Sequence, residues 1–138
     1  MRLIEIYTDG ASHGNPGFSG AGVYIKAQGK EHRYAFPLDI MSNHEAEFHA
    51  VIKALEICQS DFPGEILSFR TDSQVVVDAI EKNDIKNKHL APLLNLIQTL
   101  ASDFPYFFIK WIPSHQNQQA DQLARQALRQ VLNKAKLK

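Results

Sequence analysis

Apolar residues along the chain fall into short β-rich runs and longer amphipathic stretches, separated by segments rich in Gly, Pro, Asn and Asp. The short runs are typical of strands, and the longer stretches repeat their apolar positions with helical spacing. Asp9–Gly17, with three Gly and one Pro, is predicted as a turn segment. The pattern predicts five strands, at Arg2–Thr8, Ser19–Ala27, Glu31–Pro37, Glu65–Thr71 and Tyr106–Ile112. It predicts four helices: from Ser42 or Asn43 to about Gln59, Asp72–Ile80, His89–Ala101, and from Asn117 or Gln118 toward the C-terminus.

The order of these elements predicts the fold class. Three strands come first, and helices then alternate with the last two strands. This order predicts an α/β protein with a five-stranded mixed sheet, which opens with three antiparallel strands and continues with parallel ones. A helix lies between the first and fourth strands, so we expect these two to be parallel neighbours. Without a linker or a repeat, the 138 residues are expected to form one domain, 1–138.

Composition narrows the classes of function. Fifteen Lys and Arg balance fifteen Asp and Glu, which argues against binding of nucleic acid by bulk positive charge but not against a nucleic-acid enzyme. The single cysteine, Cys58, excludes an internal disulfide and a Cys-rich zinc site. No apolar run reaches the ~18 residues of a membrane span, and the charged start of the chain does not fit a signal peptide. We therefore expect a cytoplasmic protein with no membrane association.

Two predicted strands are followed by an aspartate, in Tyr7–Gly10 (YTDG) and in Arg70–Ser73 (RTDS). Ligands of open α/β sheets bind beyond the carboxyl ends of the strands. Neighbouring strands lie ~4.8 Å apart, so Asp9 and Asp72 would repel each other unless a proton or a cation joins them. Each also has a purely structural interpretation, Asp9 as a turn residue and Asp72 as a helix N-cap.

Further carboxylates come from two predicted helices. Glu45 and Glu47 lie near the start of the first helix, with Glu47 beside its buried side, and Asp121 lies in the first turns of the last helix. Each could instead only complement the helix dipole. Together with Asp9 and Asp72, Glu47 and Asp121 would form an oxygen-only cluster that suits Mg²⁺ or Mn²⁺. Two such ions can activate a water and stabilise the leaving oxygen in phosphodiester hydrolysis.

Four motifs in order resemble the catalytic segments of type 1 ribonuclease H over nearly the whole chain. They are YTDGASxGNPG at Tyr7–Gly17, SNxxAEF at Ser42–Phe48, TDSQ at Thr71–Gln74 and WIPSHQNxxADxLA at Trp111–Ala124. The resemblance implies a ribonuclease H-like fold and metal-dependent hydrolysis of the RNA strand of RNA–DNA hybrids, leaving 3′-hydroxyl and 5′-phosphate ends. It implies that two Mg²⁺ or Mn²⁺ ions bind to four catalytic carboxylates, those of Asp9, Glu47, Asp72 and Asp121.

The resemblance also implies roles for neutral residues. Those expected to touch the hybrid or to shape the loop beside it are Gly10, Asn15, Pro16, Ser42, Asn43 and Gln74. Amides and hydroxyls suit a minor groove in which the 2′-hydroxyl tells RNA from DNA. Turn formation by Asn15 and N-capping by Ser42 or Asn43 are the structural alternatives. His115 is a candidate for proton transfer or product release, and its alternative is an anchor of the surface loop.

The chain departs from many relatives at three places. Only five residues separate His115 from Asp121, so the longer His-bearing loop of many relatives is absent. Ile80–Leu90 is too short for the basic protrusion that grips hybrid in some relatives, and affinity could come from Lys86, Lys88 and the basic tail instead. His44 stands where many relatives carry a second Asn.

These departures keep other functions open beside hybrid hydrolysis. One is a module of the same fold that binds hybrid or a partner with little activity, and another is a related nuclease acting on DNA junctions or duplexes. We expect an RNA–DNA hybrid as the partner and a monomer with no obligate protein partner. Trp111 is predicted to pack in the core, and so is the Cys58 thiol.

Overall fold

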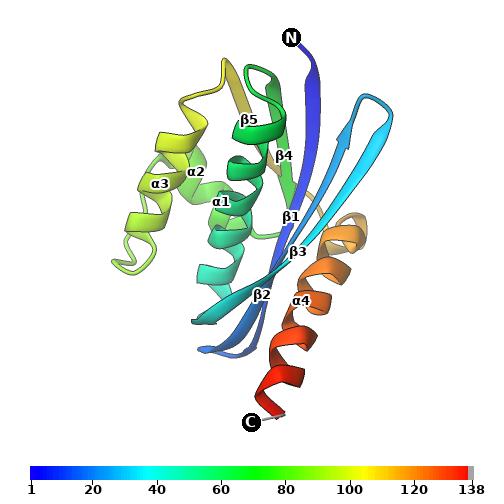
Figure 1. Ribbon diagram of the computed structural model, residues 1–138. Coiled ribbons are helices and arrows are strands. Elements are labelled where there is room, and N and C mark those ends of the chain that lie inside the picture. Colours follow the sequence, from blue (N-terminus) through cyan, green and yellow to red (C-terminus); the bar gives the residue numbers. More distant parts are fainter. Residues whose placement is uncertain (137–138) are drawn as a thin grey trace.

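The computed structural model describes residues 1–136 and shows one sheet with helices on both faces (Figure 1). The sheet has the order β3-β2-β1-β4-β5, which confirms the predicted α/β class with a mixed sheet. Helices α1, α2 and α3 cover one face, and α4 lies alone on the other (Figure 1). The strands are β1 Leu3–Gly14, β2 Gly17–Ala27, β3 Lys30–Met41, β4 Ile66–Thr71 and β5 Tyr106–Trp111. The helices are α1 Asn43–Asp61, α2 Gln74–Lys82, α3 Ala91–Ala101, the short 3₁₀ turn η1 Ser114–Gln116, and α4 Gln118–Lys136.

The first strand is longer than the sequence predicts. Asp9–Gly17 was expected to be a turn, but β1 continues through this segment to Gly14, and only Asn15 and Pro16 form the turn. The reason is tertiary, because β2 pairs with β1 in antiparallel register from Glu5↔Lys26 to Gly14↔Gly17. These hydrogen bonds outweigh the turn preference of Gly, Ser and Asn.

The third strand is also longer than predicted, because it continues past Pro37 to Met41. Proline has no N–H to donate to a neighbouring strand, but β3 lies at the edge of the sheet, where that donor is not needed.

Strands β1 and β4 are parallel neighbours, as predicted, in register from Leu3↔Ile66 to Tyr7↔Arg70. Helix α1 makes the crossover between them, and β4 pairs in parallel with β5. The parallel pairing of β1 ends at Tyr7, whereas its antiparallel pairing with β2 continues. Beyond Tyr7, one side of β1 is therefore open, and this opening positions the site.

Helix α1 begins with a capping box. Ser42 Oγ accepts a hydrogen bond from the Glu45 N–H at 3.1 Å, and the Glu45 carboxylate accepts one from the Ser42 N–H at 3.0 Å. Of the two predicted caps, Ser42 is the one used. The apolar side of α1 packs on the sheet, and Cys58 is buried there as predicted, where burial raises the pKa of its thiol to about 12.

Helix α2 is capped by Ser73, whose hydroxyl accepts from the Val76 N–H at 3.3 Å. The predicted alternative role of Asp72 as the N-cap is therefore wrong, and its carboxylate is free for another role. Within residues 1–136, no helix is long and apolar enough to cross a membrane.

Helix α4 packs across β2 at two glycines. A Cβ at Gly22 would clash with the Ala120 carbonyl, and one at Gly20 would clash with the Ala124 carbonyl. Ala120, Leu123 and Ala127 of α4 are buried. The close contact places the first turn of α4 beside the open side of β1.

Candidate active site

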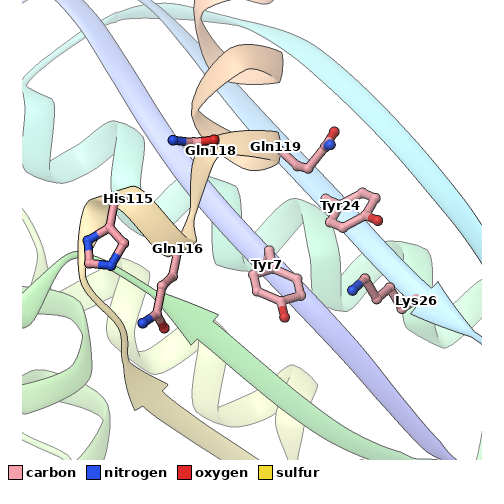
Figure 2. A pocket seen from close by; sticks show the side chains of 7 residues that line it. All are labelled: Tyr7, Tyr24, Lys26, His115, Gln116, Gln118 and Gln119. Atoms are coloured by element: carbon pink, nitrogen blue, oxygen red, sulfur yellow. The ribbon is translucent and has the colours of Figure 1, made fainter.

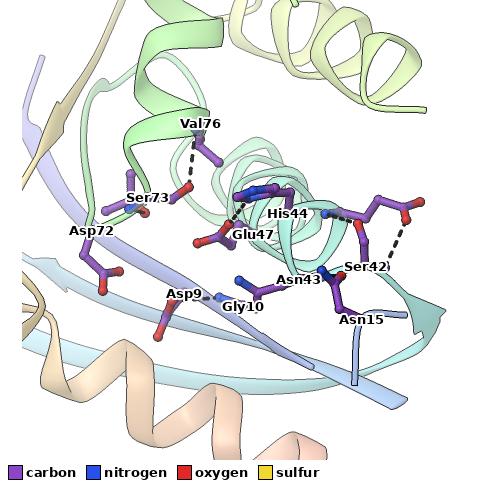
Figure 3. A network of polar contacts seen from close by, with 12 residues as sticks. Asp9, Gly10, Asn15, Ser42, Asn43, His44, Glu47, Asp72, Ser73 and Val76 are labelled. Carbon is purple, nitrogen blue, oxygen red and sulfur yellow. Dashed lines mark hydrogen bonds and ion pairs between the residues drawn. The ribbon is translucent and has the colours of Figure 1, made fainter. Parts of the chain in front are cut away.

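The four predicted carboxylates come from four elements and line one open cavity of about 430 Å³. Asp9 lies on β1, Glu47 on α1, Asp72 after β4 and Asp121 in the first turn of α4. Figure 3 shows Asp9, Glu47 and Asp72 around the same space, and its dashed lines mark hydrogen bonds and ion pairs among the residues drawn. Segments more than 100 residues apart in the sequence therefore present their acids to one point of the fold.

Asp9 was predicted to follow the end of a strand, but it lies within β1. Its backbone is paired with Gly22, two residues past the last parallel contact with β4. Its side chain is only 9% exposed. Burial, and then the charges of Asp72 and Asp121, raise the pKa of this carboxyl to about 8, although the Gly10 N–H donates to Oδ1 at 3.0 Å.

Glu47 is the glutamate that reaches the cavity, whereas Glu45 serves the capping box. The approach is close because a Cβ on Gly10 would clash with the Ala46 carbonyl carbon and the Glu47 amide nitrogen. Burial raises the pKa of the Glu47 carboxyl, opposed by its contact at 2.9 Å with His44 Nδ1. Hydrogen bonding by the Ser42 N–H lowers the pKa of Glu45. The two neighbouring acids thus have separate roles.

Asp72 is held from two sides. Asn117 Nδ2 donates to Asp72 Oδ1 at 3.0 Å, and Trp111 Nε1 donates to the Asp72 carbonyl at 3.2 Å. Trp111 is 47% exposed, so the prediction that it packs in the core is wrong. The functional position of Asn117 was missed, and its only signal in the sequence is its place in the last motif.

Asp121 is more exposed than Asp9 and Glu47. Its side chain is 39% exposed and accepts a hydrogen bond from Arg125 Nε, one turn further along α4, at 3.2 Å. Arg125 also lines the cavity. Among residues 1–136, the Arg125 guanidinium is thus the one positively charged group that lines this cavity, and the other charged groups lining it are the four carboxylates.

Only two of the predicted substrate-binding residues line this cavity. Gly10 and Asn43 line it. The Asn43 N–H donates to Asn15 Oδ1 at 3.1 Å, so the Asn15–Pro16 turn is tied to the start of α1 beside Ser42 (Figure 3).

Gln74 is exposed on α2 and donates to Asp78 Oδ1 at 2.8 Å. Contact of any of these residues with a substrate stays a prediction.

His115 does not line the cavity of the carboxylates. It lies in η1 and lines a separate cavity of about 270 Å³ together with Tyr7, Tyr24 and Lys26 (Figure 2). Its predicted role in proton transfer stays a prediction, because His115 does not share the cavity of the four carboxylates.

The donor set of the carboxylate cavity fits a hard divalent cation. All four side chains offer oxygen, and the pKa of Asp9 is raised by burial and then by the charges of Asp72 and Asp121, which a cation would offset. Within residues 1–136, no three His, Cys, Asp or Glu side chains are already arranged as a metal cage. A cation would therefore have to draw these carboxylates inward.

Comparisons with known proteins agree with this geometry. The RNase H family model matches residues 1–129. "Putative hydrolase EbsB" of Enterococcus faecalis is 46% identical over 129 residues, covering 91% of this chain and 94% of that protein. Ribonuclease H of Parvibaculum lavamentivorans is 33% identical over 141 residues, covering 91% and 92%. The crystal structure of LC11-RNase H1 in complex with an RNA/DNA hybrid superposes with a TM-score of 0.87 at 29% identity, covering 94% of this chain and 99% of that one.

Proposed function

The chain belongs to the RNase H family as a type 1 form without the basic protrusion, and from this membership we propose that it hydrolyses the RNA strand of RNA–DNA hybrids. The proposed products carry 3′-hydroxyl and 5′-phosphate ends. The convergence of Asp9, Glu47, Asp72 and Asp121 on one cavity carries the proposal. The hybrid bound by LC11-RNase H1 supports this choice of substrate.

The carboxylates are proposed to hold two Mg²⁺ or Mn²⁺ ions, in keeping with the use of divalent metals by the family. Bound there, the ions would supply an activated water and stabilisation of the leaving oxygen. Asp9, whose carboxyl is close enough to Asp72 and Asp121 to be affected by their charges, would contribute to holding both ions. Glu47 and Asp72 would serve the side of the attacking water, and Asp121 would serve the side of the leaving group, with His115 as the candidate proton carrier.

Recognition of the hybrid is assigned to neutral groups at the rim of the cavity. Asn15, Ser42, Asn43 and Gln74 offer amides and hydroxyls from the β1–β2 turn and the starts of α1 and α2. Such groups suit hydrogen bonding in the wide, shallow minor groove, where the 2′-hydroxyl is displayed. We propose that the chain acts as a monomer without an obligate protein partner.

A panel of end-labelled substrates tests this function. RNA–DNA hybrid, duplex DNA and duplex RNA are incubated with the full chain in Mg²⁺ and, separately, in Mn²⁺. We expect cleavage of the RNA strand of the hybrid alone, with the end groups identified by their response to phosphatase and kinase. Asp72→Asn keeps the shape of the side chain but removes its charge, so it is expected to abolish turnover while hybrid binding remains.

Two results would contradict the proposal. Binding of hybrid without cleavage in either metal by a folded wild-type chain would indicate a binding module. Preferential cleavage of duplex DNA would instead indicate a nuclease with another substrate.

A further inference from the structure

Asn117 is a buried polar residue at the junction between η1 and α4. Asn117 is 1% exposed, although it lies between the exposed residues Gln116 and Gln118. It does not line the cavity of the carboxylates, so it has no direct access to a substrate there. Buried polar side chains are usually hydrogen-bonded, so the partners of Asn117 should account for its burial.

The side chain and the backbone of Asn117 together connect parts of the chain that carry three of the four acids. Nδ2 donates to the carbonyl oxygen of Thr8, the residue before Asp9, at 2.9 Å and to Asp72 Oδ1 at 3.0 Å. The Asn117 carbonyl accepts from the Asp121 N–H at 3.0 Å in the first turn of α4. One residue thus touches β1, the end of β4 and the start of α4.

The orientation of this amide follows from its partners. A backbone carbonyl and a carboxylate only accept hydrogen bonds, so the nitrogen and not the oxygen must face them. Asn117 Oδ1 is buried and finds no hydrogen-bond donor within residues 1–136. The local environment therefore requires the two N–H groups, and the oxygen is left unpaired as a consequence.

We propose that Asn117 is a positioning residue, which holds the Asp72 carboxylate at a fixed place relative to β1 and α4. The proposal rests on the proposed function. A ligating carboxylate has a second oxygen that can rotate, and a buried donor on Oδ1 sets the direction of the other oxygen. Partners of this kind orient the groups that bind metal, and their loss typically lowers metal affinity or activity by about 10–100-fold.

The first test compares two amide-to-acid substitutions at neighbouring positions. Asn117→Asp preserves the size of the side chain but replaces the donor with a second acceptor facing Asp72. Gln118→Glu makes the same chemical change on an exposed residue outside the carboxylate cavity. We expect kcat on hybrid to fall by about 10–100-fold in Asn117→Asp, with a KM close to that of the wild type, and both constants to be unchanged in Gln118→Glu.

A fall in kcat without a rise in KM separates positioning of the reacting groups from loss of substrate binding. Thermal unfolding of each variant shows whether the chain is folded at the assay temperature. Wild-type kcat in folded Asn117→Asp would overturn the proposal.

The second test needs no activity and uses the wild-type chain. In ¹⁵N-labelled protein, the side-chain amide protons of Asn117 are expected to exchange with solvent much more slowly than those of Gln118. They are also expected to shift when Asp72→Asn removes the charge of their acceptor. Exchange as fast as that of Gln118 would overturn the positioning geometry, including in the case where Asn117→Asp fails to fold.

The two tests separate the two proposals. A wild-type chain that does not cleave hybrid contradicts the proposed function, whereas the amide exchange of Asn117 still decides the positioning role. Cleavage by the wild type together with full kcat in Asn117→Asp contradicts positioning alone.

Discussion

At the scale of single residues, Asp9 lies in surroundings that favour its protonated form. Its pKa is raised to about 8 by burial and by the neighbouring charges of Asp72 and Asp121. In the unfolded chain the same group ionises near pH 4. Between these values the folded state binds a proton that the unfolded state releases, so the stability of the metal-free protein falls as pH rises.

This linkage predicts the effect of Asp9→Asn. The neutral amide removes the titration, so the variant is expected to have a higher Tm than the metal-free wild type at pH 8 and a similar Tm near pH 4. Thermal unfolding in EDTA at both pH values measures the difference. A variant that is less stable than the wild type at pH 8 would show that the Asp9 carboxyl is not under electrostatic strain.

The residues of the site were predictable where chemistry sets them apart in sequence. Asp9, Glu47, Asp72 and Asp121 stand out as acids in distinct motifs, and all four line one cavity. Asn117 does not stand out, because its partners Thr8 and Asp72 lie 109 and 45 residues away. Nor does the sequence show that the Trp111 indole donates to the Asp72 carbonyl at the surface. Such roles depend on tertiary neighbours.

At the scale of elements, the order of strands and helices was predictable, but the length of β1 was not. Local composition favours a turn after Asp9, and pairing with β2 along Gly10–Gly14 overrides that preference. The sequence therefore identified Asp9 as an acid of the site, but it predicted a turn where the structure has a strand. Asp9 lies at an opening because β4 stops pairing at Tyr7 while β1 continues.

The contact between α4 and β2 supports a prediction at the same scale. In Gly22→Ala, the new methyl group would clash with the Ala120 carbonyl and force α4 away from the sheet. We expect a loss of about 1–3 kcal/mol of the free energy of unfolding, as for other overpacked contacts. Chemical denaturation measures this change.

Gly29→Ala is the control, because nothing lies near a Cβ at that position and only its positive φ opposes the substitution. Hybrid cleavage by Gly22→Ala is expected to fall as well, because Asp121 moves with α4. Equal stability of Gly22→Ala and the wild type would contradict the packing described for this face.

At the scale of the whole molecule, a formal net charge of zero must be reconciled with a polyanionic substrate. The connection between α2 and α3 carries two exposed lysines, Lys86 and Lys88, in place of a long basic segment. His89 in the same connection lies close enough to Glu45 for its charge to lower the pKa of that carboxyl. The connection therefore lies on the side of the molecule where α1 begins.

Replacing both lysines tests whether this side contacts the hybrid backbone. In Lys86→Gln/Lys88→Gln, we expect a higher KM for hybrid, an unchanged kcat, and a salt dependence of binding reduced by about two phosphate contacts. Binding measured over a series of salt concentrations gives the slope. Lys30→Gln, at the start of β3 beside the β2–β3 turn, which lies at the opposite end of the sheet (Figure 1), is expected to leave the slope unchanged. An unchanged slope in the double variant would place the hybrid elsewhere.

The solitary place of α4 on its face of the sheet gives this helix an influence on the enzyme beyond its share of the packing. No other helix within residues 1–136 shares that face (Figure 1), and Asp121 enters the cavity from it. Transient undocking of α4 would expose Asp9, Glu47 and Asp72 to water and inactivate the site, while the sheet and helices α1, α2 and α3 stay folded. Proteolysis or an antibody directed at residues 129–136, which do not line the cavity, would then act as an inhibitor.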